Sequence, residues 1–322
     1  MDVIQLFADI VSYRWMGLIP DSYLGSAVNF FILDFVKIGV LLLLVNYLMA
    51  VIRYYFPMEK ARDVLSKKHW LPLSYLLAAL LGVITPFCSC SSIPLFIGFL
   101  GAGIPLGITF TFLISSPLIN EASLYLFPAI FGWQVTVLYN LFGIFIAIMG
   151  GMLIQKLKLD KYVIPKIFVF KSKKEIEKEK GEKIPFKELV PLFFKEGNKI
   201  TKSLLLYVVL GIALGALIHG FVPSGLIEQY LSGESFWTVP IAVLLAVPLY
   251  ANSITVLPIM EALVNKGASF GTVLSFMTAV VALSLPEALM LKKVMRWPLL
   301  AIFFGITIFG IILMGYLFNF IF

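Results

Sequence analysis

Long runs of apolar residues alternate with short polar stretches along this chain of 322 residues. Four of the runs are long enough to cross a bilayer core of about 30 Å as single helices. They cover roughly residues 29–52, 127–154, 201–222 and 297–322. The pattern therefore predicts an all-α integral membrane protein.

Two further apolar regions, 71–126 and 237–291, are interrupted by proline. The first contains Pro72, Pro86, Pro94, Pro105 and Pro117, and the second contains Pro240, Pro248, Pro258 and Pro286. Because proline removes a backbone hydrogen bond inside a helix, we expect broken or re-entrant helices in both regions. Non-helical backbone at membrane depth requires protein or a water-filled cavity around it. The breaks are therefore the expected place for a functional site.

Charge is scarce and concentrated in one segment. Only 13% of the residues are charged and 60% are apolar, whereas about 25% are charged in soluble domains, which excludes an ordinary soluble enzyme. Lys156–Lys202 holds 14 of the 25 Lys and Arg residues and 7 of the 18 Asp and Glu residues, so the net charge of +7 arises there. Within it, the lysines of the run KSKKEIEKEKGEK are interleaved with glutamate and lack an aromatic stacking platform beside them. We therefore expect a solvated loop and no nucleic-acid partner.

Lysine and arginine in the short connections predict the orientation in the membrane. Arg53–His69, the central loop and Lys292–Arg296 are basic, whereas 223–236 has no Lys or Arg. The basic stretches are expected in the cytoplasm, so the two interrupted regions must cross in opposite directions. The predicted divisions are an interfacial N-terminal segment (1–28), a first transmembrane repeat (29–154), a basic cytoplasmic loop (155–200) and a second transmembrane repeat (201–322).

The two interrupted regions also resemble each other in sequence. Three pairs of segments align at offsets of 162, 164 and 166 residues: PFCSCSSIPLF from Pro86 with PLYANSITVLP from Pro248, GIPLGITFTFL from Gly103 with GASFGTVLSFM from Gly267, and NEASL from Asn120 with PEALM from Pro286. Chance similarity between apolar stretches is the alternative explanation. Two inverted-topology repeats with discontinuous helices are typical of secondary transporters whose site lies at the repeat interface.

The first break carries a polar run from Thr85 to Ser92 that contains both cysteines of the chain, Cys88 and Cys90. In an extended stretch these two side chains point to the same side. Two soft sulfurs suit a thiophilic species such as a trivalent arsenical or a soft metal ion, and the serines suit an anionic group. The alternative is that small Cys and Ser residues only permit close helix packing. The predicted substrate-binding residues are Cys88, Ser89, Cys90, Ser91, Ser92, Asn120, Tyr250, Asn252 and Ser253.

Two carboxylates, Glu121 and Glu287, lie near the later breaks of the two regions. A carboxylate in an apolar segment is costly to ionise, so both are candidates for proton coupling. The alternative is an interfacial position, since Lys292 follows Glu287 closely. The sequence has no P-loop, HxxxH motif or catalytic triad. We therefore expect no enzyme activity, no cofactor and no resident metal.

At TPFCSCSSIPLF and SSPLINEA the sequence resembles a family of bacterial and archaeal predicted permeases that includes the ArsP-type efflux permeases for trivalent organoarsenicals. The resemblance covers nearly the whole chain and implies a multi-spanning permease with Cys88 and Cys90 as substrate-contacting positions. Two sulfurs suit a methylated or aromatic trivalent arsenical, whereas inorganic arsenite prefers three. The expected function is thus export of a small thiol-reactive solute across the cell membrane, and the expected partners are this solute and the lipid bilayer.

Two other functions remain open at the level of sequence. One is a permease or channel for a small sulfur-containing or other anion, bound by the serines. The other is a membrane thiol oxidoreductase, which requires a resolving cysteine pair or a quinone or haem site. The chain supplies only two cysteines and two histidines for that chemistry.

Overall fold

The computed structural model describes most of the chain in seven stretches. They are 3–20, 22–55, 71–84, 89–120, 122–164, 236–249 and 268–322, together with isolated positions between 191 and 264. Every regular element in these stretches is helical, and their β-type pairing is limited to an isolated antiparallel bridge between Val163 and Met295. The predicted all-α fold class is therefore confirmed.

The segment predicted as a lead-in helix, 1–28, is divided by a turn. α1 (Val3–Asp9) runs into a π-helical segment, Ile10–Trp15, and Gly17 follows with a left-handed φ of +67°. α2 (Tyr23–Tyr55) begins beyond this turn and extends the helix predicted over 29–52 at both ends. The lead-in therefore stops earlier than the sequence predicted.

Polar side chains determine where α2 begins and how α1 packs against it. The Ser22 hydroxyl accepts the N–H of Gly25 at 3.0 Å, which caps the first turn of α2. Asn29 Nδ2 donates to Asp9 Oδ1 at 2.9 Å and to Ser12 Oγ at 2.8 Å. These bonds join the N-terminal helical segments to the start of α2.

The first interrupted region consists of short helices, although Pro94 and Pro117 lie inside helices rather than between them. Its pieces are α4 (Leu71–Ile84), α5 (Ser89–Gly101), α6 (Leu106–Leu118) and a π-helical segment (Ala122–Leu126). Gly103, with φ of +79°, and Pro105 separate α5 from α6. Each piece is shorter than the 20 or so residues that a bilayer core requires.

The run 127–154 is also divided, although the sequence predicted one continuous helix. α7 (Phe127–Ile130) ends at Phe131, and α8 (Gly132–Lys156) starts at Gly132. The φ of Gly132 is +82°, a left-handed conformation that glycine adopts readily and that interrupts the helix. A short 3-10 turn, Leu159–Tyr162, follows α8.

The second half has a similar succession of short and long helices. They are α12 (Thr238–Ala246), α14 (Phe270–Ala282), α15 (Leu285–Leu291) and α16 (Trp297–Ile321). α16 confirms the helix predicted over 297–322. The helix predicted over 201–222 lies largely outside the described residues.

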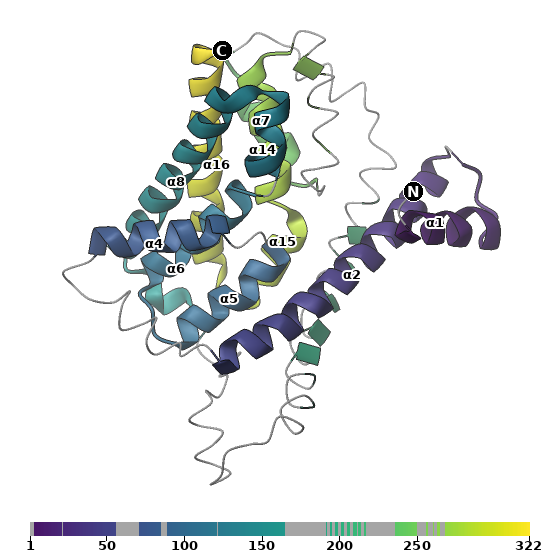
Figure 1. Ribbon diagram of the computed structural model, residues 1–322, viewed down its shortest axis with the longest axis horizontal. Coiled ribbons are helices and arrows are strands. Elements are labelled where there is room, and N and C mark those ends of the chain that lie inside the picture. Colours follow the sequence, from purple (N-terminus) through teal and green to yellow (C-terminus); the bar gives the residue numbers. More distant parts are fainter. Residues whose placement is uncertain are drawn as a thin grey trace. The chain divides into compact units, whose positions relative to one another are not determined.

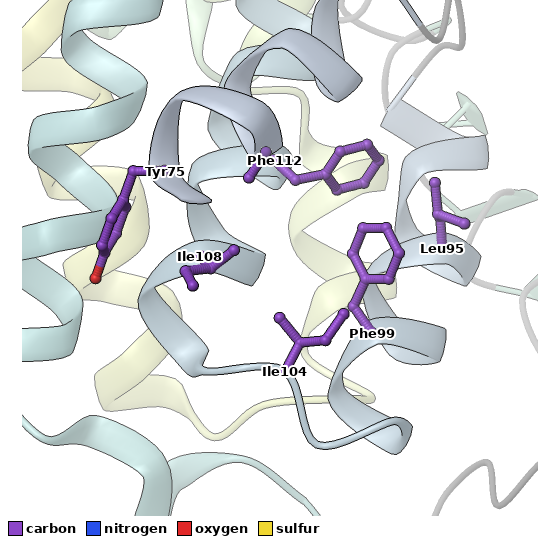
Figure 2. Close-up of a cluster of buried hydrophobic side chains, with 7 residues drawn as sticks. Tyr75, Leu95, Phe99, Ile104, Ile108 and Phe112 are labelled. Atoms are coloured by element: carbon purple, nitrogen blue, oxygen red, sulfur yellow. The ribbon is translucent and has the colours of Figure 1, made fainter. Parts of the chain in front are cut away.

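One compact unit of the chain consists of Leu42–Leu204 and Met290–Ile306. α6 is its central helix: all of its residues are buried, and it packs against α4, α5 and α8 (Figure 1). Figure 2 shows the apolar core where α4, α5 and α6 meet, with the Phe99 and Phe112 rings 5.2 Å apart. The labelled core residues are Tyr75, Leu95, Phe99, Ile104, Ile108 and Phe112.

The other compact unit consists of Met1–Leu41, Leu205–Leu289 and Thr307–Phe322. In it α14 packs against α12 and against the C-terminal part of α16. The Tyr316 ring stacks on Phe236 with centroids 4.6 Å apart, and its hydroxyl donates to the Phe236 carbonyl at 2.8 Å.

Three of the described helices are long and apolar enough to cross a membrane. The qualifying segments are Tyr23–Val40, Gly132–Lys156 and Trp297–Ile321. The remaining apolar helices of 10–17 residues include α6 and α14. Long and short apolar helices therefore occur together in the described part of the chain.

Candidate functional site

α5 begins inside the Cys–Ser run rather than after it. The backbone is helical from Ser89 onward, and Ser92 is fully buried. The extended stretch predicted through Ser92 is therefore wrong for this part. Serine is well tolerated in a first helical turn, where backbone N–H groups lack intrahelical partners. The argument that Cys88 and Cys90 point to the same side required an extended backbone, and it does not apply to a helix that starts at Ser89.

The end of α6 contains a buried hydroxyl that no described residue binds. The Ser115 hydroxyl donates to the Phe112 carbonyl at 3.1 Å. Ser116 is 1% exposed, and its Oγ has no hydrogen-bond partner among the residues that the structure describes. Pro117 follows and has no N–H to donate to the carbonyl of Leu113. The end of α6 therefore combines buried polar atoms with an interrupted hydrogen-bond ladder.

Asn120, a predicted substrate-binding residue, caps the start of the π-helical segment Ala122–Leu126. Its Oδ1 accepts the N–H of Ser123 at 3.0 Å. Ser123 Oγ lies 2.8 Å from the Asn120 carbonyl and 3.1 Å from Asn140 Oδ1. The Tyr139 hydroxyl donates to the carbonyl of Leu118 at 2.8 Å, just before the break. Asn120 thus belongs to a polar network that holds the connection between α6 and the π-helical segment.

The break between α14 and α15 also has polar side chains in the interior. Ser284 is 1% exposed, and its Oγ has no hydrogen-bond partner in the described part of the chain. Glu287, on the first turn of α15, is 0% exposed. This burial contradicts the alternative in which Glu287 is a surface ion near Lys292.

The same hydrogen bond occurs near the start of α6 and near the start of α14. The N–H of Gly107 donates to Gln155 Oε1 at 2.8 Å, and the N–H of Gly271 donates to Asn319 Oδ1 at 2.7 Å. In each pair the two residues are 48 positions apart. The two bonds, here called the glycine–amide contacts, are related by the offset of 164 that aligns the sequences around α6 and α14.

Each glycine–amide contact is accompanied by a hydroxyl and by a second glycine. The hydroxyl bonds are Thr111 Oγ1 to the Gly107 carbonyl (3.0 Å) and Ser275 Oγ to the Gly271 carbonyl (2.7 Å). A Cβ atom at Gly151 would collide with Thr111 Oγ1, and one at Gly315 would collide with Ser275 Oγ. Small residues at these positions let the two helices of each pair approach closely.

Gln155 and Asn319 were not among the residues predicted from sequence. A signal for them existed, because the offset that aligns α6 with α14 also relates Gln155 to Asn319. Other predicted site residues lie outside the described residues, namely Cys88, Glu121, Tyr250, Asn252 and Ser253, as do the side chains of Ser89, Cys90 and Ser91. Among the described residues, no group of three or more His, Cys, Asp or Glu side chains could hold a metal ion.

Helices of membrane-crossing length, together with interrupted helices that carry buried polar groups, define a membrane protein of the kind that moves solutes. The chain belongs to the ArsP_1 family, described as predicted permease, whose model matches residues 23–320. It is 24% identical over 297 residues to the UPF0718 protein MJ0584 of Methanocaldococcus jannaschii, covering 76% of this chain and 81% of that relative. No solved structure shows a significant match. The protein is therefore a membrane permease.

Proposed function

We propose that this permease is a multi-pass secondary transporter of the cell membrane, built from two repeats of opposite topology over 29–154 and 201–322. The recurrence of the glycine–amide contact carries the proposal. A duplicated helix pair accounts for the same donor residue, the same acceptor group and the same separation of 48 residues at both places. The short helices α6 and α14 suit the discontinuous helices of such transporters. The loop 155–200 faces the cytoplasm in this proposal.

The proposed substrate is a small thiol-reactive solute, such as a trivalent methylated or aromatic arsenical, which is moved outward. Cys88 and Cys90 supply the soft ligands. The burial of Ser92 supports an internal site, since Ser92 belongs to the same polar run as the two cysteines. The proposed binding residues around the two sulfurs are Ser89, Ser91, Ser92, Tyr250, Asn252 and Ser253. Asn120 holds the connection between α6 and the following π-helical segment.

Transport against a gradient needs an energy source, and this sequence has no nucleotide-binding motif. Glu121 and Glu287 are the proposed coupling residues for a proton gradient. The complete burial of Glu287 supports this role, because an ionised carboxylate inside the membrane is costly and marks an ion or proton pathway.

A permease for a small anion is the second candidate function. The start of α5 at Ser89 favours it, since the N–H groups and dipole at the N-terminus of a helix attract negative charge. The serines would then contact the substrate and the cysteines would not be required. Membership of a permease family supports either form of transport over a membrane thiol oxidoreductase.

Flux measurements with purified full-length protein in liposomes test the proposal. Liposomes loaded with a trivalent phenylarsenical are expected to release it faster than protein-free liposomes, with saturation by substrate. Excess sulfate or thiosulfate is expected not to compete. Release of the anions alone would favour the second candidate, and no protein-dependent flux of either solute would contradict both.

A further inference from the structure

The break between α14 and α15 contains a buried hydroxyl, that of Ser284, which binds none of the described residues. Ser284 stands directly before α15, where its carbonyl accepts the N–H of Ala288 at 3.1 Å. A serine in this position normally accepts a backbone N–H of the following turn through its hydroxyl. The sequence from Ser284 to Glu287 even has the spacing of a capping box. Yet Ser284 Oγ is buried and makes no hydrogen bond to any described residue.

In the first half of the chain, a residue in a comparable position, Asn120, does cap the helical segment that follows it. Asn120 also stands before a helical segment, and its carbonyl accepts the N–H of Leu124 four residues later at 3.3 Å. Asn120 and Ser284 are related by the offset of 164 that relates α6 to α14, although the sequence alignment beyond the break pairs Asn120 with Pro286 at an offset of 166. Here the side chain does cap the following segment, through Asn120 Oδ1 and the N–H of Ser123. The side chain of Asn120 thus caps a helical segment, whereas the hydroxyl of Ser284 binds no described residue.

Two groups near Ser284 in the chain favour a cation, a carboxylate and the C-terminus of α14, whereas the N-terminus of α15 carries partial positive charge. Glu287 is fully buried one turn further along α15. α14 ends at Ala282, and the carbonyl groups at the C-terminus of a helix carry partial negative charge. Pro286 has no N–H to donate to the Ala282 carbonyl four residues earlier. A carboxylate, a hydroxyl and the last carbonyl of α14 therefore belong to the short segment from Ala282 to Glu287.

We propose that the α14–α15 break binds a monovalent alkali cation of the size of Na⁺, through the Glu287 carboxylate, the Ser284 hydroxyl and the Ala282 carbonyl. Hard cations bind to oxygen ligands of this type, and helix ends at the breaks of secondary transporters bind coupling ions. One carboxylate balances one positive charge, whereas sites for divalent cations usually contain more. A proton would need only the carboxylate and would leave the Ser284 hydroxyl unexplained. The inference rests on the proposed function in that the bound ion would be a coupling ion, which would exchange at Glu287 with the proton proposed above.

The test uses the purified full-length protein in detergent, with binding of radioactive ²²Na⁺ and thermal unfolding as measurements. Saturable ²²Na⁺ binding is expected, together with a higher Tm in NaCl than in choline chloride at equal ionic strength and pH. Ser284→Ala and Glu287→Gln are each expected to weaken binding by about tenfold or more and to remove the difference in Tm. Size-exclusion profiles like that of the wild type identify the folded variants.

Ser275→Ala is the matched control, since it removes a hydroxyl from α14 that is bonded to the Gly271 carbonyl. It is expected to lower Tm equally in both salts and to keep ²²Na⁺ binding. Absence of saturable binding in the wild type, or normal binding by folded Ser284→Ala, would overturn the proposal. Arsenical flux driven by a pH gradient without ²²Na⁺ binding would contradict only this inference. ²²Na⁺ binding without flux of any tested solute would contradict only the proposed function.

Discussion

The backbone N–H of Gly107 donates a 2.8 Å hydrogen bond to Oε1 of Gln155, which lies near the C-terminus of α8. The bond satisfies one of the N–H groups that the first turn of a helix leaves without an intrahelical partner. It also attaches the start of α6 to the end of α8. Asn319 does the same for α14 and α16 through Gly271. The two short helices are therefore held to long helices in the same way.

We predict that Gln155→Leu and Asn319→Leu each lower the free energy of unfolding by about 1–3 kcal/mol, because a helix-end N–H loses its acceptor. Gln155→Glu and Asn319→Asp keep an acceptor oxygen and are expected to retain more stability than the leucine variants. Thermal unfolding in detergent measures the difference. A lower stability of only one of the two leucine variants would show that the two contacts are not equivalent.

The close helix packing beside these contacts gives a second prediction. Gly151→Ala and Gly315→Ala are expected to destabilise the protein by about 1–3 kcal/mol, since the added methyl group meets Thr111 or Ser275. Gly305→Ala, in α16, is the control, because a Cβ atom there has no neighbour within 4 Å. It is expected to be neutral or slightly stabilising, as alanine favours helix. Equal effects at Gly305 and Gly315 would contradict the packing explanation.

The proposed orientation of the loops predicts opposite labelling of two serine positions. In a variant without Cys88 and Cys90, single cysteines replace Ser172 in the basic loop and Ser232 in the stretch without Lys or Arg. A membrane-impermeant thiol reagent added to intact cells is expected to label the Ser232→Cys protein alone, because basic loops remain in the cytoplasm. Labelling of both from one side would remove the argument for inverted repeats.

The coupling proposal predicts different effects of two carboxylate substitutions. Glu121→Gln is expected to reduce flux driven by a pH gradient in proteoliposomes, because glutamine cannot carry a proton through the break. Glu261→Gln is the matched control, since Glu261 does not lie at a break shared by the two halves and Lys266 follows it closely. Equal flux in both variants, with unchanged pH dependence, would exclude Glu121 as a coupling residue.

The sulfur-ligand mechanism predicts that Cys88→Ser and Cys90→Ser each abolish transport of a trivalent organoarsenical. Serine is similar in size but offers a hard oxygen donor in place of a soft sulfur. Expression and thermal stability are expected to remain near those of the wild type, and substrate is expected to protect both thiols from alkylation. Normal transport by the serine variants would favour the anion site that begins at Ser89.

The sequence alone determined the fold class and the main interruptions of the helices. Apolar runs and scarce charge require a lipid environment, and proline or glycine acts on the backbone within a few residues of its own position. These local effects explain why α5 and α6 are separate, with Gly103 and Pro105 between them. The turn at Gly132 was missed because glycine fits either a helix or a left-handed turn, and only the surrounding packing selects between them.

The tertiary structure decided how the polar residues at the breaks are used. Asn120 and Ser284 are both polar residues beside a break, yet Asn120 caps a helical segment and the Ser284 hydroxyl makes no bond to a described residue. The acceptor for the Gly107 N–H is 48 residues away along the chain, at Gln155. A hydrogen bond depends on which distant atom lies within about 3 Å, and folding of the whole chain determines that distance. The sequence could therefore identify the breaks as polar, and the packing of the helices assigned each polar group its partner.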